Sequence, residues 1–146
     1  MGVNTLNLSA SDNDVLDIVA VAGTINNDGI VHIPGNTGTG VFVVATSNVA
    51  AVGGAITASA DTNGVSLPVT ITICETDPAT SACTNPTTPA ATATVNVTAG
   101  GTNTFGIFVQ GNGNITPNAA TKRIFVRFRD AGNVIRGSTS VAVQTN

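Results

Sequence analysis

Side chains that could do chemistry are scarce in this sequence, and the first group of them is acidic. Asp12, Asp14 and Asp17 lie close together near the N-terminus, with Asn13 between the first two. Calcium takes six to eight hard oxygen ligands, which carboxylates and amides supply. The segment has no DxDxDG run and no glutamate nearby, so the same residues could instead form turn hydrogen bonds in a solvated linker. We expect no cofactor and keep calcium at these aspartates as the alternative.

The two cysteines form the second group. Cys74 and Cys83 are separated by eight residues that include Pro78, and a strand followed by a turn would bring their side chains together. Closing so short a loop would stabilise the fold by about 2–3 kcal/mol. The alternative is two free thiols in a reducing compartment, where disulfides are rare. Zinc is disfavoured because two cysteines and His32 leave its tetrahedral shell incomplete. The spacing therefore favours a disulfide.

All five basic residues fall in one stretch near the C-terminus, KRIFVRFRDAGNVIR, over residues 122–136. With its one aspartate this stretch has a formal charge of +4, which leaves −7 for the rest of a chain whose net charge is −3. Residues 123–129 alternate as in a strand that has one buried face. The other face is a candidate interaction strip made of Arg123, Phe125, Arg127 and Arg129.

Two interpretations of this strip remain open. Cations on the outer face of a strand close to a sheet edge discourage uncontrolled strand addition. Alternatively, the strip meets the acidic residues near the N-terminus of a neighbouring copy. Complementary patches on different faces would give a head-to-tail contact that propagates into a filament or array.

Residues suited to catalysis are few. His32 is the only histidine, and no serine or aspartate stands in an order typical of a catalytic triad. Glu75 and Asp77 lie between the two cysteines, which suits a rigid tip better than a cleft. Lys122 is the only lysine and begins a strand, as the lysine of an isopeptide bond often does, but no acid partner can be identified. We predict that the protein is not an enzyme.

Composition restricts the partners as well as the fold. Hydrophobic residues make up 42% of the chain and charged residues only 9%, and Val, Ile and Thr prefer strands while strong helix formers are scarce. A net charge of −3 argues against a nucleic-acid partner. Trp and Tyr are absent, which disfavours glycan binding because sugar rings usually stack on aromatic side chains. No apolar run reaches the length of a membrane span.

The pattern along the chain predicts short strands separated by turn signals. We expect one domain over residues 15–146, with residues 1–14 as an extension, linker or donated strand. A Pro-rich loop is expected over residues 75–91. The expected strands cover residues 15–21, 30–33, 41–46, 55–60, 69–74, 93–98, 104–110, 123–129 and 138–145. Such spacing is typical of an all-β Greek-key sandwich of about seven to nine antiparallel strands without significant helix.

Several segments also resemble a known kind of module. NNDGIVHIPGNTGTGVFVVAT, LPVTITICETDPATSAC, TFGIFVQGNGNI and RIFVRFRDAGNVIRGSTSVAVQT follow one another in this order. They resemble Ig-like β-sandwich modules that are repeated in tandem in large secreted or surface proteins of bacteria, over roughly residues 15–146. The resemblance implies an extracellular structural or adhesive module and brings no catalytic residue or ligand. In this chain, however, the module stands without a second copy.

These observations lead to one expected function and two alternatives. We expect a non-enzymatic structural or adhesive module, secreted or at the cell surface, whose partners are copies of itself or adjacent modules. No signal peptide follows Met1, so either the protein is cytoplasmic or the chain is a piece of a longer secreted protein; the cysteine pair favours the second. The first alternative is a filament subunit that donates residues 3–10 as a strand to a neighbour. The second is a glycan-binding module.

Overall fold

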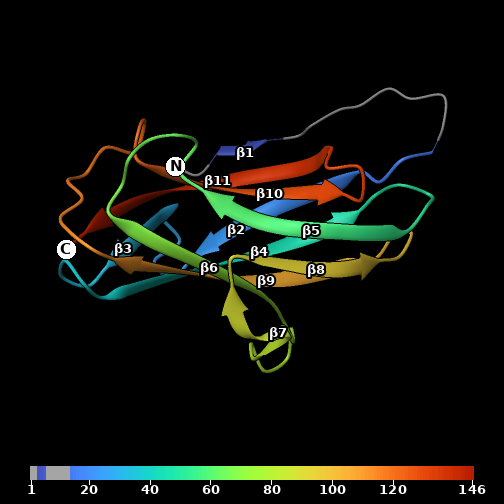
Figure 1. Cartoon of the computed structure of the whole chain (residues 1–146), viewed down its shortest axis with the longest axis horizontal. Coiled ribbons are helices and arrows are strands. Elements are labelled where there is room, and N and C mark those ends of the chain that lie inside the picture. Colours follow the sequence, from blue (N-terminus) through green and yellow to red (C-terminus); the bar gives the residue numbers. More distant parts are fainter. Residues whose placement is uncertain (1–2, 6–13) are drawn as a thin grey trace.

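The computed structural model of the chain describes residues 3–5 and 14–146. These residues fold into two β-sheets that pack face to face (Figure 1). Within these two ranges no helix is long and apolar enough to span a membrane. The predicted all-β sandwich is confirmed.

The first sheet has six strands. Its members are β1 (Val3–Thr5), β3 (Ile30–Ile33), β5 (Gly54–Asp61), β8 (Thr92–Val97), β10 (Arg123–Asp130) and β11 (Ile135–Thr145). The order is β1–β11–β10–β5–β8, and β3 also pairs with β11. β1 runs antiparallel to residues 138–140 of β11, whereas β3 runs parallel to residues 142–145. β10 is therefore an inner strand, flanked by β11 and β5.

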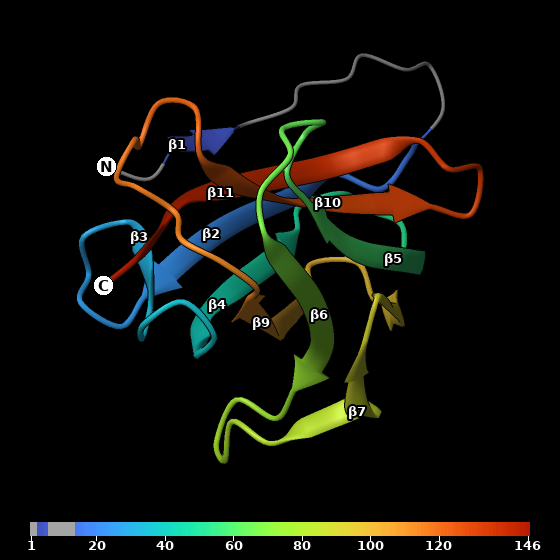
Figure 2. The ribbon, with the colours of Figure 1, turned by 60° about the vertical axis from the view of Figure 1, so that its left-hand side comes forward.

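The second sheet has five strands in the order β2–β4–β9–β6–β7. They are β2 (Ile18–Thr24), β4 (Thr39–Asn48), β6 (Val69–Thr76), β7 (Cys83–Ala90) and β9 (Thr102–Gly111). All four neighbouring pairs in this sheet are antiparallel. β7 and the loop that precedes it stand away from the body of the sandwich in two different views, while β6 stays paired with β9 (Figures 1 and 2).

Alternation along the strands builds the core between the sheets. β10 buries Val126 and Phe128, and β4 buries Phe42, while their neighbours in sequence face outward. The rings of Phe105 in β9 and Phe128 in β10 lie 5.3 Å apart between their centroids and join the two sheets. The inward side chains expected in β10 are thus the ones that are buried.

The prediction of a loop over residues 75–91 is wrong. β6 continues to Thr76, and β7 occupies residues 83–90 although it contains Pro86 and Pro89. β7 is the outermost strand of its sheet, and Pro86 and Pro89 fall in the irregular stretch between its paired residues Asn85 and Ala90, where the ladder with β6 needs no N–H from them. The described residues form eleven strands, more than the seven to nine expected, and the pair of β3 with β11 is parallel.

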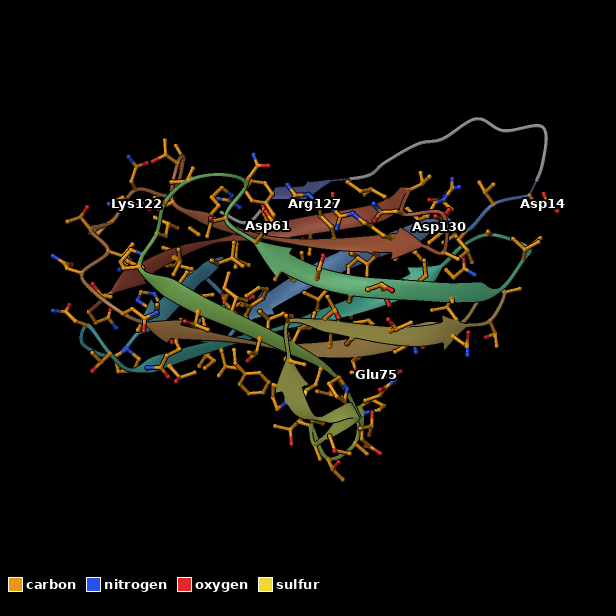
Figure 3. All side chains as sticks on the ribbon, viewed as in Figure 1. Asp14, Asp61, Glu75, Lys122, Arg127 and Asp130 are labelled. Atoms are coloured by element: carbon orange, nitrogen blue, oxygen red, sulfur yellow. A yellow bond between two sulfur atoms is a disulfide. The ribbon has the colours of Figure 1, made fainter. Side chains whose placement is uncertain are left out.

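The described chain begins in the six-stranded sheet with β1, which pairs with β11, resumes at Asp14 and ends at Asn146. Asp14 lies at one end of the long axis (Figure 3), while the C-terminus lies at the other end (Figure 1). β2 and β11, the strands next to these two points, therefore run along the length of the molecule.

Candidate functional site

The candidate site lies on the outer face of the six-stranded sheet, where side chains form rows across three strands. In β5 and β10 the buried positions include 56, 58, 124, 126 and 128, so the odd-numbered side chains between them point outward. The register places Arg129 beside Thr57, and Arg127 beside Ser59. On β8, Thr94 and Thr92 continue these two rows. We call this surface the arginine face; it consists of Thr57, Ser59, Asp61, Thr92, Thr94, Phe125, Arg127 and Arg129.

Arg127 is held by an acidic partner. Its Nη1 forms an ion pair with Asp61 Oδ2, and its Nη2 donates to Asn63 Oδ1 over 2.8 Å. The guanidinium also lies 5.2 Å from the centroid of the Phe125 ring, a cation–π contact. Burial raises the pKa of Asp61, but the hydrogen bonds from Arg127 and from the backbone N–H of Asn63 outweigh this effect. Together with the nearby positive charges they keep the pKa of Asp61 below its ordinary value. Figure 3 shows this pair in the middle of the sheet.

A second ion pair closes the turn between β10 and β11. Arg136 Nε lies 2.6 Å from Asp130 Oδ2, and both side chains are largely buried. The other carboxylate oxygen, Oδ1, accepts the backbone N–H groups of Gly132 and Val134. The hydrogen bond from Val134, and then the one from Arg136, lower the pKa of Asp130 despite its partial burial. Both oxygens of this carboxylate are therefore already used.

Arg129 differs from these two arginines. Its Nη1 donates to Ser59 Oγ over 2.9 Å, and no carboxylate of residues 14–146 forms an ion pair with it. Arg129 lines a hollow of about 340 Å³ that opens on the arginine face. The other lining residues are Thr57, Ser59, Thr92, Asp130, Ala131 and Asn133. This hollow combines one cation without an acidic partner with several hydroxyl groups.

Arg123 does not belong to the exposed strip that the alternation predicts. It is 8% exposed, and its Nε and Nη2 donate to Ser140 Oγ over 3.1 and 3.0 Å. Nη1 donates to the carbonyl of Ala119 over 2.8 Å, so the segment before β10 covers this end of the strand. Burial lowers the pKa of Arg123, although a guanidinium stays charged. The idea that these cations protect a strand close to a sheet edge also fails for β10, because β10 is an inner strand.

The predicted disulfide is present at the β6–β7 hairpin. Cys74 and Cys83 are joined with an S–S distance of 1.97 Å and a Cα–Cα distance of 5.6 Å. In the loop between them, Asp77 Oδ1 accepts the N–H groups of Ala79 and Thr80, and these bonds, the one from Thr80 first, lower the pKa of Asp77. Glu75 accepts a hydrogen bond from Asn103 over 2.7 Å. Asp77 thus holds the loop of the tip together, and Glu75 ties the base of the hairpin to β9.

His32 ties β3 to the end of the chain. Its Nε2 lies 2.8 Å from Asp28 Oδ2, and its Nδ1 lies 2.9 Å from Asn146 Oδ1. Hydrogen bonds to Asn146 and then to Asp28 raise the pKa of His32, because the imidazolium can donate to both oxygens at once. The sequence interpretation of His32 as a residue without a triad did not include this tether, although the spacing of Asp28 and His32 could have suggested it.

The acidic group near the N-terminus is only partly described. Asp12 lies outside the described residues. Asp14 is exposed, and the backbone of Asp17 bonds with the side chain of Asn48 and the N–H of Val49. Within residues 14–146 no cluster of three acidic, histidine or cysteine side chains is arranged to hold a metal. The calcium prediction, which needs Asp12, stays a prediction.

Lys122 lies at the end of the sheet opposite to Asp130 (Figure 3). Its Nζ donates to the carbonyl and to the hydroxyl of Thr116. These contacts anchor the segment that precedes β10, the same segment that covers Arg123 through Ala119.

No family model and no curated protein matches this sequence. Among solved structures, it is similar to a CARDB domain from Pyrococcus furiosus that was crystallised with di-metal ions, at 10% identity over 94% of this chain and 100% of that chain, with a TM-score of 0.45. The N-terminal domain of PorA is 10% identical over 87% of this chain and 97% of that chain, also with a TM-score of 0.45. A PapD-like domain of human CEP192 is 9% identical over 100% of this chain and 96% of that chain, again with 0.45. Likenesses this distant do not identify a function.

Proposed function

We propose that the protein is a non-catalytic, extracellular β-sandwich module that works as a spacer between other modules of a secreted or cell-surface protein, with a subsidiary adhesive role. The observation that carries the proposal is the two-sheet sandwich itself, which buries a continuous hydrophobic core between its sheets and is cross-linked at the β6–β7 hairpin by the Cys74–Cys83 disulfide. A rigid body of this kind keeps its dimensions when it is joined to other modules in series.

The disulfide supports an oxidising compartment. Disulfides persist in secreted and surface proteins and are rare in the cytosol. Both cysteines of the chain are used in it, and no free thiol remains. A thiol assay on protein recovered from an oxidising and from a reducing compartment tests this part: we expect reactive thiols only in the second sample.

The filament alternative rests on a separate observation. β1 pairs with residues 138–140 of its own chain, and the same pairs would form between two copies if β1 were exchanged. Deleting residues 1–10 and following sedimentation over a salt series separates the two ideas. A spacer keeps one monomeric state with or without the deletion. A filament subunit assembles as the full chain and loses assembly when β1 is removed.

Small-angle scattering from one, two and three copies of the full chain joined in series tests the spacer role. We expect the maximum dimension to rise by the same increment with each added copy. A maximum dimension that stays nearly constant, because the copies pack side by side, would contradict the proposal. The measurement should be repeated at high salt, since contacts between charged patches weaken as ionic strength rises.

A further inference from the structure

The inference concerns Arg129 and the hollow beside it. Three arginines lie on or next to this part of the arginine face, and two of them are paired with carboxylates: Arg127 with Asp61, and Arg136 with Asp130. A guanidinium carries five N–H donors, and in the described part of the chain Arg129 uses one bond, to Ser59. The face therefore keeps one cation whose charge no carboxylate of residues 14–146 neutralises by direct contact.

The remaining lining of the hollow has a definite chemistry. Thr57, Ser59 and Thr92 carry hydroxyl groups, which donate and accept hydrogen bonds, and Asn133 carries an amide. Asp130 adds a carboxylate, but Arg136 and two backbone N–H groups already occupy its oxygens. Arg129 is thus the dominant charge in the hollow, and an anionic group that enters finds a favourable field.

The shape of the site restricts the ligand further. A planar carboxylate matches the fork of a guanidinium and can form two parallel hydrogen bonds with it. The hollow of about 340 Å³ has the volume of about ten water molecules, enough for a single sugar ring and its substituents. Its lining contains no aromatic side chain, so a neutral sugar would lack the usual stacking surface.

We propose that this hollow binds an acidic sugar, with the carboxylate on Arg129 and the ring hydroxyls on Thr57, Thr92 and Asn133. An extended peptide is a poorer fit, because peptides that join a sheet use the free edge of a strand, and Arg129 lies on the inner strand β10. The site would supply the adhesive part of the proposed function, and its failure would leave the spacer role standing. Figure 3 shows the region, with Asp130 near one end of the sheet and Lys122 at the other.

The test is a titration of the full, isotope-labelled chain by NMR with sodium galacturonate, and in parallel with galactose and with sodium acetate. We expect galacturonate to shift the amide signals of Ser59, Thr92 and Asn133 together with the Arg129 side-chain signal. Galactose has the same ring without the carboxylate, and acetate has the carboxylate without the ring. Both should bind at least about tenfold more weakly, since each lacks one half of the contacts.

Matched variants make the test specific. R129Q removes the charge on the hollow and should weaken galacturonate binding by about tenfold or more, because a charge-assisted contact is lost. K122Q removes one positive charge at the far end of the sheet and should leave binding within about twofold. T57V keeps Arg129 and removes one hydroxyl, so it should weaken galacturonate binding without changing acetate binding.

Four results would overturn the proposal. They are the absence of shifts around Arg129 at tens of millimolar galacturonate, equal binding of galactose, equal binding of acetate, and unchanged binding by R129Q. Equal binding of acetate would reduce the site to a general carboxylate site and remove the sugar. Since Arg129 points outward from the sheet, the R129Q variant can be checked for folding by its amide spectrum before the titration.

Discussion

The two ends of β10 carry arginines that occupy equivalent positions in the alternation and have opposite surroundings. At one end Arg123 is buried and donates to Ser140 and to the carbonyl of Ala119. At the other end Arg129 is half-buried, makes one hydrogen bond and faces a hollow. The difference lies in what covers each end: the segment before β10 lies over Arg123, and no segment within residues 14–146 makes a comparable set of contacts with Arg129.

This comparison separates a structural cation from an available one. Arg123 has its donors satisfied by neutral oxygens inside the fold, so its removal should cost stability. Arg129 contributes little to the fold and keeps donors for a ligand. Positive charge alone therefore says little about function; the hydrogen bonds that a guanidinium already makes decide whether it can do anything else.

The largest effect expected from this comparison is on folding. R123A should lower the free energy of unfolding by about 2–4 kcal/mol, because it leaves buried acceptors without donors and creates a cavity. R129A should lower it by less, about 0.5–1 kcal/mol, because this half-buried side chain loses a single hydrogen bond, to Ser59. Urea unfolding of both variants checks the pair. Equal losses of unfolding free energy in R123A and R129A would contradict the distinction between the covered end of β10, at Arg123, and the end at Arg129.

The disulfide provides a reference for the size of these changes in the free energy of unfolding. Reducing the bond between Cys74 and Cys83, or replacing both with serine, should lower the free energy of unfolding by about 2–3 kcal/mol, since the unfolded chain gains the entropy of an open loop. R123A and the loss of the disulfide should therefore lower the free energy of unfolding by similar amounts. The comparison is made by urea unfolding with and without reductant; a midpoint that does not move on reduction would show that the β6–β7 tip is independent of the rest of the fold.

A smaller effect on the free energy of unfolding is expected at the Arg129 end of β10, where Asp130 holds the turn to β11. D130A should cost about 1 kcal/mol, from one ion pair and the turn hydrogen bonds. The pKa of Asp130 is lowered in the folded state, so this stabilisation is present above the ordinary pKa of an aspartate and is lost as the pH falls through the folded value. Between neutral and strongly acidic pH, the free energy of unfolding should fall more steeply for the wild type than for D130A. Parallel curves would argue that this pair contributes nothing.

The smallest effect concerns His32, far from both arginines. Its pKa is raised in the folded state by Asn146 and Asp28, so the stabilisation is complete below the ordinary histidine pKa and disappears as the pH rises through the folded value. Because the pair is partly exposed, the change should stay below about 1 kcal/mol. H32Q should remove this pH dependence, which lies at and above the ordinary histidine pKa. A pH dependence that survives in H32Q would have to come from another group.

Sequence patterns located the strands of the core well and the arginine face only in part. The alternation in residues 123–129 correctly predicts which side chains of β10 are buried in the core. It treats Arg123 and Arg129 alike, because a period of two contains no information about a covering loop. The strand partners are likewise missing from the pattern: Thr57 and Ser59 lie beside Arg129 and Arg127 only through the register of β5 with β10.

The hairpin at the disulfide shows a second limit of the pattern. Prolines at positions 78, 86 and 89 indicate a loop, yet β7 forms over residues 83–90. A proline interrupts a ladder only where its N–H would be needed, and Pro86 and Pro89 lie between Asn85 and Ala90, where this outermost strand makes no pair with β6. Which strand lies at an edge depends on the whole topology, so this outcome could not be read from the local sequence.

The spacer role is tested most directly by stretching single molecules that contain three copies of the full chain in series. The proposal predicts one cooperative unfolding event per copy, each with the same gain in length. Cys74 and Cys83 are nine positions apart and their Cα atoms already span 5.6 Å, so reduction of the disulfide should lengthen each event by about 25 Å, at about 3.3–3.6 Å per extended residue. Gradual extension without discrete events, in oxidised and reduced protein alike, would contradict the proposal that this sandwich bears load between its two ends.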